Sequence, residues 1–112
     1  MGLHIGIVGG GFVGRVHVEA LLAHPDVDRI SIADHDPVAL ETIARNYPTQ
    51  RAVSDHAALL DDPSLDVLDI CLPHDLHHPV VIEAFAAGVD VIADKPIANT
   101  LVEADEMLAA AD

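Results

Sequence analysis

Three glycines near the start of the chain have the spacing of a phosphate-binding turn. Gly9, Gly11 and Gly14 lie in the segment Gly-Gly-Gly-Phe-Val-Gly, which fits the pattern G-x-G-x-x-G. The first glycine permits a tight turn, the second allows a pyrophosphate to approach, and the third allows a helix to pack closely on a strand. Free N–H groups and the positive dipole end of that helix attract phosphate. Together with its place between a strand and a helix, the motif predicts a dinucleotide site.

An acidic residue stands where such a site needs one. Asp34 ends an apolar run and follows Gly14 by about 20 residues, the usual distance in dinucleotide-binding units. A carboxylate at this point accepts hydrogen bonds from the adenosine ribose hydroxyls. It also repels a 2′-phosphate, and no arginine stands beside it, so NAD is favoured over NADP. The alternative is a glycine turn and an acidic loop that bind no ligand.

Two later loops also carry groups suited to chemistry. The first contains Pro73, His74 and His77, and the second is Asp94-Lys95-Pro96. Ligands of open α/β sheets bind beyond the carboxyl ends of the strands, so both loops are expected near the nicotinamide end of a dinucleotide. Lys95 is the only lysine, and beside a ligand it could donate a hydrogen bond or take part in proton transfer. The alternative is an ordinary loop lysine.

The elements that position these residues alternate along the chain. Short, continuous apolar runs predict strands at Leu3–Val8, Arg29–Ala33, Arg51–Val53, Leu65–Leu72 and Val89–Ala93. Helical spacing and capping residues predict helices at Val13–Ala23, from Pro37 to about Asn46, from Ser54 to Leu60, at Pro79–Ala87, and from Thr100 toward Ala111. The predicted N-caps are Asp36, Ser54 and Thr100, and Thr100 forms a capping box with Glu103. This order predicts an α/β fold with a doubly wound parallel sheet and helices on both faces.

Composition sets limits on the partners. The chain has 112 residues, enough for one domain, and 51% of them are hydrophobic. Its 19 acidic residues against 5 basic ones give a net charge of −14, which disfavours nucleic acid and anionic membranes. The acidic excess indicates either a solvated surface that keeps the protein soluble or adaptation to high salt. No apolar run reaches the ~18 residues that a membrane span needs.

Cysteine and histidine give weaker signals. Cys71 is the only cysteine, so a reducing, cytoplasmic compartment is expected, and its apolar strand indicates a core position. His17, on the first predicted helix, is expected to be a packed, hydrogen-bonded residue and not a catalyst. His74, Asp75, His77 and His78 lie close together, but without a thiolate or a helical histidine pair no metal site is expected there.

These motifs together resemble a known family. They are Gly6 to His17, Ala33-Asp34, Asp66 to Pro73 leading into His77, and Asp94-Lys95-Pro96 with Thr100-Leu101 after it. In order and spacing they resemble the N-terminal domain of the glucose–fructose oxidoreductase, inositol dehydrogenase and MocA family. The resemblance covers essentially the whole chain.

The resemblance implies a Rossmann domain that holds NAD or NADP for oxidation of a hydroxyl carbon in a sugar or polyol. It implies pyrophosphate contacts at Gly9, Gly11, Phe12, Val13 and Gly14, and a ribose contact at Asp34. It implies contacts near the nicotinamide at Pro73, His74, His77, Asp94, Lys95 and Pro96, with Lys95 as the catalytic residue. Asp94 stands where the family has glutamate, and His74 where it often has asparagine.

The family's second domain, which carries the substrate contacts, is not in these 112 residues, nor is the last strand of the nucleotide-binding domain. We therefore expect the chain alone to lack turnover, with a small hydroxylated substrate bound only if a second domain is supplied. An open sheet edge also predicts self-association. The alternative is a stand-alone dinucleotide-binding sensor or partner module without catalysis.

Overall fold

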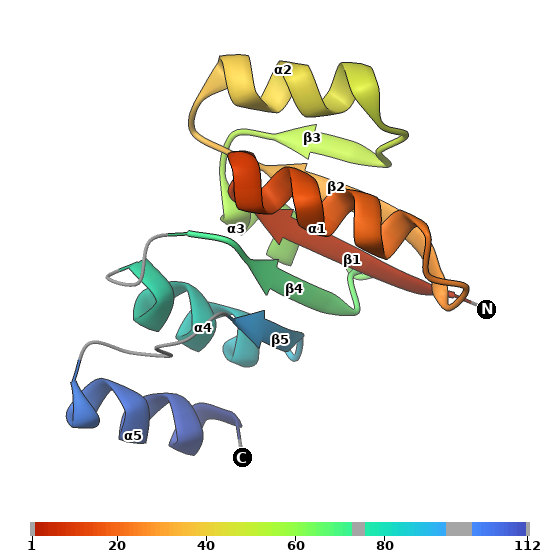
Figure 1. Ribbon diagram of the computed structural model, residues 1–112. Coiled ribbons are helices and arrows are strands. Elements are labelled where there is room, and N and C mark those ends of the chain that lie inside the picture. The colour runs from red at the N-terminus through yellow and green to blue at the C-terminus, as the bar shows by residue number, and fades with distance from the viewer. Residues whose placement is uncertain (1, 73–75, 94–99, 112) are drawn as a thin grey trace.

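The computed structural model describes residues 2–72, 76–93 and 100–111, and its centre is a parallel sheet. The strands are β1 (Leu3–Val8), β2 (Val27–Ala33), β3 (Arg51–Val53), β4 (Val67–Ile70) and β5 (Asp90–Ala93). They lie in the order β3-β2-β1-β4-β5, and every neighbouring pair is parallel (Figure 1). The expected parallel α/β sheet is therefore confirmed, and the chain crosses from one half of the sheet to the other after β3.

Five helices accompany the strands in the described ranges. They are α1 (Phe12–Leu22), α2 (Pro37–Asn46), α3 (His56–Leu60), α4 (His77–Ala86) and α5 (Leu101–Ala111). Among these residues no helix combines the length and the apolar character that a membrane crossing requires.

The core consists of two apolar clusters, one on each face of the sheet. Side chains of β1 and β2 that point to one face pack with Val18 of α1 and Ile43 of α2. The opposite face packs with Leu59 of α3, Val81 of α4 and Met107 of α5. Alternate residues of the strands thus bury apolar side chains on both faces, which is why the strands read as continuous apolar runs. The helices cover both faces, as a doubly wound fold requires (Figure 1).

Helix boundaries depart from the sequence prediction by one or two residues, and at the starts of α3 and α4 the difference has a clear physical cause. Asp55, and not Ser54, caps α3, because its carboxylate accepts a hydrogen bond from the Ala57 N–H at 3.0 Å. This bond also lowers the pKa of Asp55. Helix α4 starts at His77, two residues before the expected start at Pro79. Proline is tolerated there because the first-turn N–H groups of a helix have no partner within the helix.

Two predicted caps are confirmed. The Asp36 carboxylate accepts a hydrogen bond from the Val38 N–H at 2.9 Å, directly before the proline that opens α2. The Thr100 hydroxyl accepts one from the Glu103 N–H at 3.1 Å, at the start of α5. Each cap satisfies a backbone donor that the helix itself leaves unpaired.

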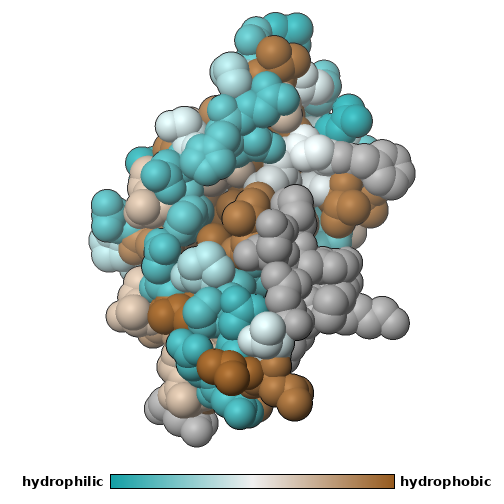
Figure 2. Space-filling view, turned by 90° about the vertical axis from the view of Figure 1, so that its left-hand side faces the viewer, coloured by the Kyte–Doolittle hydropathy of each residue, from teal (hydrophilic) through white to brown (hydrophobic). Residues whose placement is uncertain are grey.

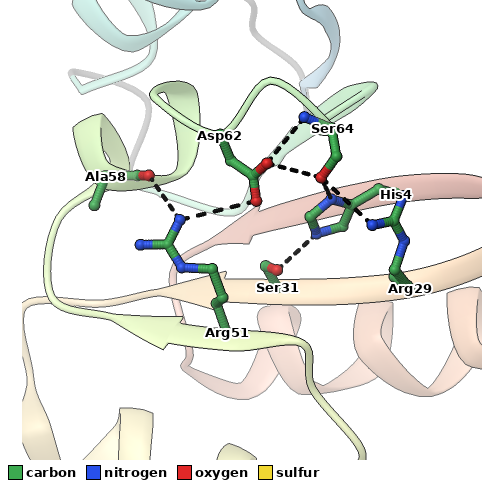
Figure 3. Close-up of polar contacts among 7 residues, drawn as sticks. All are labelled: His4, Arg29, Ser31, Arg51, Ala58, Asp62 and Ser64. Atoms are coloured by element: carbon green, nitrogen blue, oxygen red, sulfur yellow. Dashed lines mark hydrogen bonds and ion pairs between the residues drawn. The ribbon is translucent and has the colours of Figure 1, made fainter.

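A buried histidine organises the edge of the sheet at which the strands begin. His4 of β1 is fully buried, and its ring nitrogens contact the Ser31 hydroxyl at 2.7 Å and the Ser64 hydroxyl at 3.0 Å (Figure 3). Ser64 donates its own proton to Asp62, so it accepts a hydrogen bond from His4 Nδ1. Burial and the neighbouring Arg29 guanidinium lower the pKa of His4 below its ordinary value of 6.5. The ring is therefore held neutral within the network.

This network makes stability dependent on pH. The unfolded chain takes up a proton on His4 at a higher pH than the folded chain does, so the free energy of unfolding declines as the pH falls below 6.5. The slope from one such group is at most about 1.4 kcal/mol per pH unit. Urea unfolding between pH 8 and pH 5 should show a smaller slope for His4→Gln than for wild type, and an unchanged slope for the exposed control His24→Gln. Equal slopes in all three would contradict this assignment.

Candidate functional site

The glycine turn connects β1 to α1 at the edge where the strands end. Gly9 has φ = 105°, a backbone conformation that other residues adopt only with strain. Its N–H donates to the Ala33 carbonyl oxygen at 2.9 Å, which fixes the turn against the end of β2. Gly9 therefore forms the tight turn that the motif predicted at its first glycine.

The third glycine allows an unusually close contact between helix and turn. A Cβ atom built on Gly14 would overlap with the carbonyl oxygen of Gly9 and would lie 2.9 Å from its carbonyl carbon. Any other side chain at position 14 would push α1 away from the turn. The expected close packing at Gly14 is confirmed.

The second glycine faces open space. A Cβ built on Gly11 meets no atom within 4 Å, and Gly11 is the N-cap of α1 without a side-chain cap. The Gly11 carbonyl oxygen accepts a hydrogen bond from the backbone N–H of Arg15 at 3.0 Å. Val13, in the first turn of the helix, is half exposed. The start of α1 thus offers backbone N–H groups to the space beside Gly11, which is the arrangement that binds phosphate.

Asp34 joins the end of β2 to the glycine turn. One oxygen of its carboxylate accepts a short hydrogen bond from the Gly10 N–H, and the other accepts one from the Asp36 N–H at 2.8 Å. Asp34 and the glycine turn, 20 residues apart in the motif, are in direct contact. The carboxylate retains acceptor capacity, because its two oxygens provide about four lone-pair sites.

A cavity of about 220 Å³ opens beside this carboxylate. Its lining is apolar at Val8, Ala33, Leu72, Leu76, Pro79 and Val80, and polar at Asp34, His35, Ser54, His56 and Glu83. Figure 2 views the molecule from the side toward which the strands point, and apolar residues lie there at the centre among hydrophilic ones. An apolar pocket with a few polar groups at its rim suits a flat heterocycle joined to a sugar.

Sequence reasoning missed the far wall of this cavity. His56 at the start of α3 places Nε2 2.7 Å from the Glu83 carboxylate of α4, and Nδ1 lies 3.3 Å from Asp55. Ser54 and His56 directly follow β3, so the rule that placed the other loops at the carboxyl edge would also have included them. No local pattern pairs His56 with Glu83, which are 27 residues apart.

The residues predicted near the nicotinamide are described only in part. Pro73, His74, Asp94, Lys95 and Pro96 lie outside the described residues. His77 is fully buried at the start of α4, and its Nε2 lies 2.9 Å from the Leu72 carbonyl oxygen. This contact ties α4 to the end of β4, and a direct contact of His77 with a cofactor stays a prediction.

Of the four residues in the segment where no metal site is expected, the two that the structure describes have separate partners. His74 and Asp75 lie outside the described residues, and His77 contacts the Leu72 carbonyl oxygen. His78 instead faces α5, with its ring nitrogens 3.7 Å from Glu103 and 3.6 Å from Glu106.

His17 is hydrogen-bonded, as expected. Its Nδ1 lies 2.6 Å from the Asp69 carboxylate of β4. Cys71, directly after β4, packs half-buried against the apolar cluster on the α1 face.

Comparison with known proteins agrees with this geometry. The profile of the Gfo/Idh/MocA oxidoreductase family, described as an NAD-binding Rossmann fold, matches residues 3–112. Levoglucosan dehydrogenase of Pseudarthrobacter phenanthrenivorans is 34% identical over an alignment of 114 positions, which covers 94% of this chain and 29% of that protein. Myo-inositol 2-dehydrogenase of Thermotoga maritima is 27% identical over 106 residues, which cover 95% of this chain and 32% of that protein.

Solved structures show the same relationship. A levoglucosan dehydrogenase in complex with NADH and L-sorbose superposes with a TM-score of 0.91 at 34% identity, over 99% of this chain and 32% of the other. A 3-ketoreductase from Actinomadura kijaniata in complex with NADP has a TM-score of 0.90 at 25% identity, over 99% of this chain and 36% of the other. The chain thus spans about a third of each relative, and it belongs to the Gfo/Idh/MocA oxidoreductase family as an NAD(P)-binding Rossmann domain.

Proposed function

We propose that this chain is the cofactor-binding domain of an NAD-dependent oxidoreductase that acts on a hydroxyl carbon of a sugar, a polyol or a related compound. The observation that carries the proposal is the contact of Asp34 with the glycine turn at the mouth of the apolar cavity. It brings a ribose-binding carboxylate, a phosphate-binding helix start and a pocket for a heterocycle to one edge of the sheet.

The arrangement of the described residues favours one orientation of a bound dinucleotide. The pyrophosphate would lie in the open space beside Gly11, against the N–H groups of Phe12, Val13 and Gly14. The adenine would occupy the apolar cavity, and its ribose hydroxyls would donate to Asp34. The nicotinamide would then extend toward the loops that follow β4 and β5. There Pro73, His74, His77, Asp94 and Pro96 would shape its surroundings.

A preference for NAD rests on charge. Asp34 and Glu83 both line the cavity in which the 2′-phosphate of NADP would have to lie, and no Lys or Arg is among the lining residues that the structure describes. A carboxylate at the ribose repels that phosphate. Related structures hold NADH in one case and NADP in another, so the fold alone does not set the preference.

The reaction requires more protein than this chain. The bound nicotinamide supplies hydride acceptance or donation, and Lys95 would donate a hydrogen bond or move a proton beside it. Relatives are named for levoglucosan and myo-inositol, and the chain spans about a third of their length. We therefore propose a polyhydroxylated substrate held by a second domain, with no turnover by these 112 residues alone.

Charge removal at Asp34 tests the cofactor assignment. Wild type should bind NADH at least about tenfold more tightly than NADPH, a difference of about 1.4 kcal/mol. Asp34→Asn should narrow that ratio, because it removes the repulsion of the 2′-phosphate. The control Asp26→Asn removes the same charge at the opposite edge of the sheet and should leave the ratio unchanged. Fluorescence titration measures both affinities, and failure of wild type to bind either nucleotide would contradict the proposed function.

Two glycine substitutions separate folding from binding. Gly14→Ala should lower the free energy of unfolding by about 3 kcal/mol, as strong overpacking does. Gly11→Ala should stay within about 1 kcal/mol of wild type in urea unfolding, because its Cβ enters open space at an N-cap. The Gly11 variant should nevertheless bind NADH more weakly, since the methyl group would occupy the pyrophosphate space. Unchanged NADH binding by folded Gly11→Ala would contradict the proposed pose.

Self-association is expected at the β5 edge. β5 ends the described sheet, and Ile92, which pairs with Asp69 on the sheet face that carries α1, is 44% exposed. A second copy that pairs along β5 would cover this apolar edge. Light scattering should show dimers or larger species whose fraction falls in Ile92→Lys. The control Val38→Lys, which replaces an exposed apolar side chain of α2, should leave that fraction unchanged. A monomeric wild type at all concentrations would contradict this expectation.

A further inference from the structure

Three potential metal ligands converge on the face of the sheet that carries α1. His17 comes from α1, Asp69 from β4, and Cys71 from the residue after β4. One donor atom of each lies within 4.8 Å of the others. His17 Nδ1 is 2.6 Å from Asp69 Oδ2 and 3.4 Å from Cys71 Sγ, and the thiol is 3.8 Å from Asp69 Oδ1. The imidazole nitrogen thus faces the carboxylate and the sulfur at once.

The arrangement differs from that of a nucleophilic cysteine. A thiol activated by a histidine contacts one ring nitrogen, while the carboxylate that orients the ring contacts the other. Here the carboxylate and the thiol both approach Nδ1. The cluster therefore cannot pass a proton from sulfur through the ring to Asp69. Three donor atoms so close to one another are instead what the ligands of a single ion show.

The distances are close to those of a zinc site. Bonds of about 2.0–2.3 Å to nitrogen, oxygen and sulfur at a tetrahedral angle place the donor atoms about 3.4–3.6 Å apart. The separation of His17 Nδ1 and Cys71 Sγ is already 3.4 Å. The 2.6 Å hydrogen bond between His17 Nδ1 and Asp69 Oδ2 must lengthen, and the sulfur lies 3.8 Å from the other carboxylate oxygen, Oδ1. The His17 side chain, 35% exposed, has room to rotate.

The buried carboxylate of Asp69 gives an electrostatic reason for a cation at this cluster. Its side chain is only 2% exposed, and burial of a carboxylate is costly unless a cation pairs with it. Among the described residues, His17 is the one basic group within ion-pair distance of Asp69, and it is charged only when protonated. A divalent cation would neutralise the buried carboxylate permanently. The backbone holds two of the ligands in place, because Cys71 N–H donates to the Val8 carbonyl oxygen at 2.8 Å.

We propose that His17, Asp69 and Cys71 bind a zinc ion, with water at the fourth position on the half-exposed side of His17. Binding replaces the hydrogen bond between His17 and Asp69 by two metal bonds. The imidazole proton moves from Nδ1 to Nε2 by exchange with solvent, and the thiol proton of Cys71 is released to solvent. The ion would connect α1 to β4 directly beside the glycine turn, since the Cys71 carbonyl oxygen packs against Gly9. The site is distinct from the adenosine cavity, and it does not rest on the proposed function.

Cobalt substitution tests the site without any need for enzymatic activity. The 112-residue chain, stripped with chelator, is titrated with Co²⁺, and near-ultraviolet absorption from a cobalt–thiolate bond is recorded. We expect one equivalent to bind with this absorption, and Zn²⁺ to displace it. Cys71→Ser should abolish the absorption. His17→Gln and Asp69→Asn should each weaken Co²⁺ binding at least about tenfold, because even the loss of a residue that only orients a metal ligand costs that much affinity.

The control is His24→Gln, which removes an exposed imidazole outside the cluster and should bind Co²⁺ as wild type does. Circular dichroism checks that each variant is folded. If Asp69→Asn unfolds, the binding measured for His17→Gln tests the proposal, because the half-exposed His17 can be replaced without loss of the core. Absence of thiolate absorption in wild type would overturn the proposal. So would absorption of equal affinity in folded His17→Gln, because Cys71 would then bind the metal without the cluster.

Discussion

The contact between Gly14 and the carbonyl group of Gly9 is the constraint on which the rest of the site depends. It lets the first turn of α1 lie directly against the turn after β1, where no side chain could fit. The open end of the helix is thereby placed at the carboxyl edge of the sheet, beside Gly11. The sheet order brings the ends of β1, β2 and β4 to this same edge, so one close contact positions the proposed phosphate site at the carboxyl ends of these strands.

Asp34 provides the second constraint, and we propose that it serves both structure and binding. Its carboxylate accepts hydrogen bonds from Gly10 and Asp36, which hold the glycine turn against the end of β2. The same carboxylate borders the apolar cavity. A charge that orders the turn before any ligand arrives is therefore already in place for the ribose. This preorganisation reduces the cost of ordering that binding would otherwise incur.

The sequence predicted the parts of the molecule that local patterns specify. Continuous apolar runs predicted the buried parallel strands, and the Asp36 and Thr100 caps marked helix starts. Contacts between distant segments left no local pattern. Asp69 meets His17 across 52 positions, and His4 meets Ser64 across 60. Such pairs depend on the register of β4 beside β1, which hydrophobic spacing alone does not fix.

Backbone NMR of the chain during titration with NADH tests whether a dinucleotide binds at the glycine turn. We expect chemical-shift changes at the amides of Gly10, Gly11 and Val13 and around Asp34. We expect none at Asp26 and Asp66, at the opposite edge of the sheet. Changes confined to that opposite edge, or no changes at saturating NADH, would contradict binding at the glycine turn.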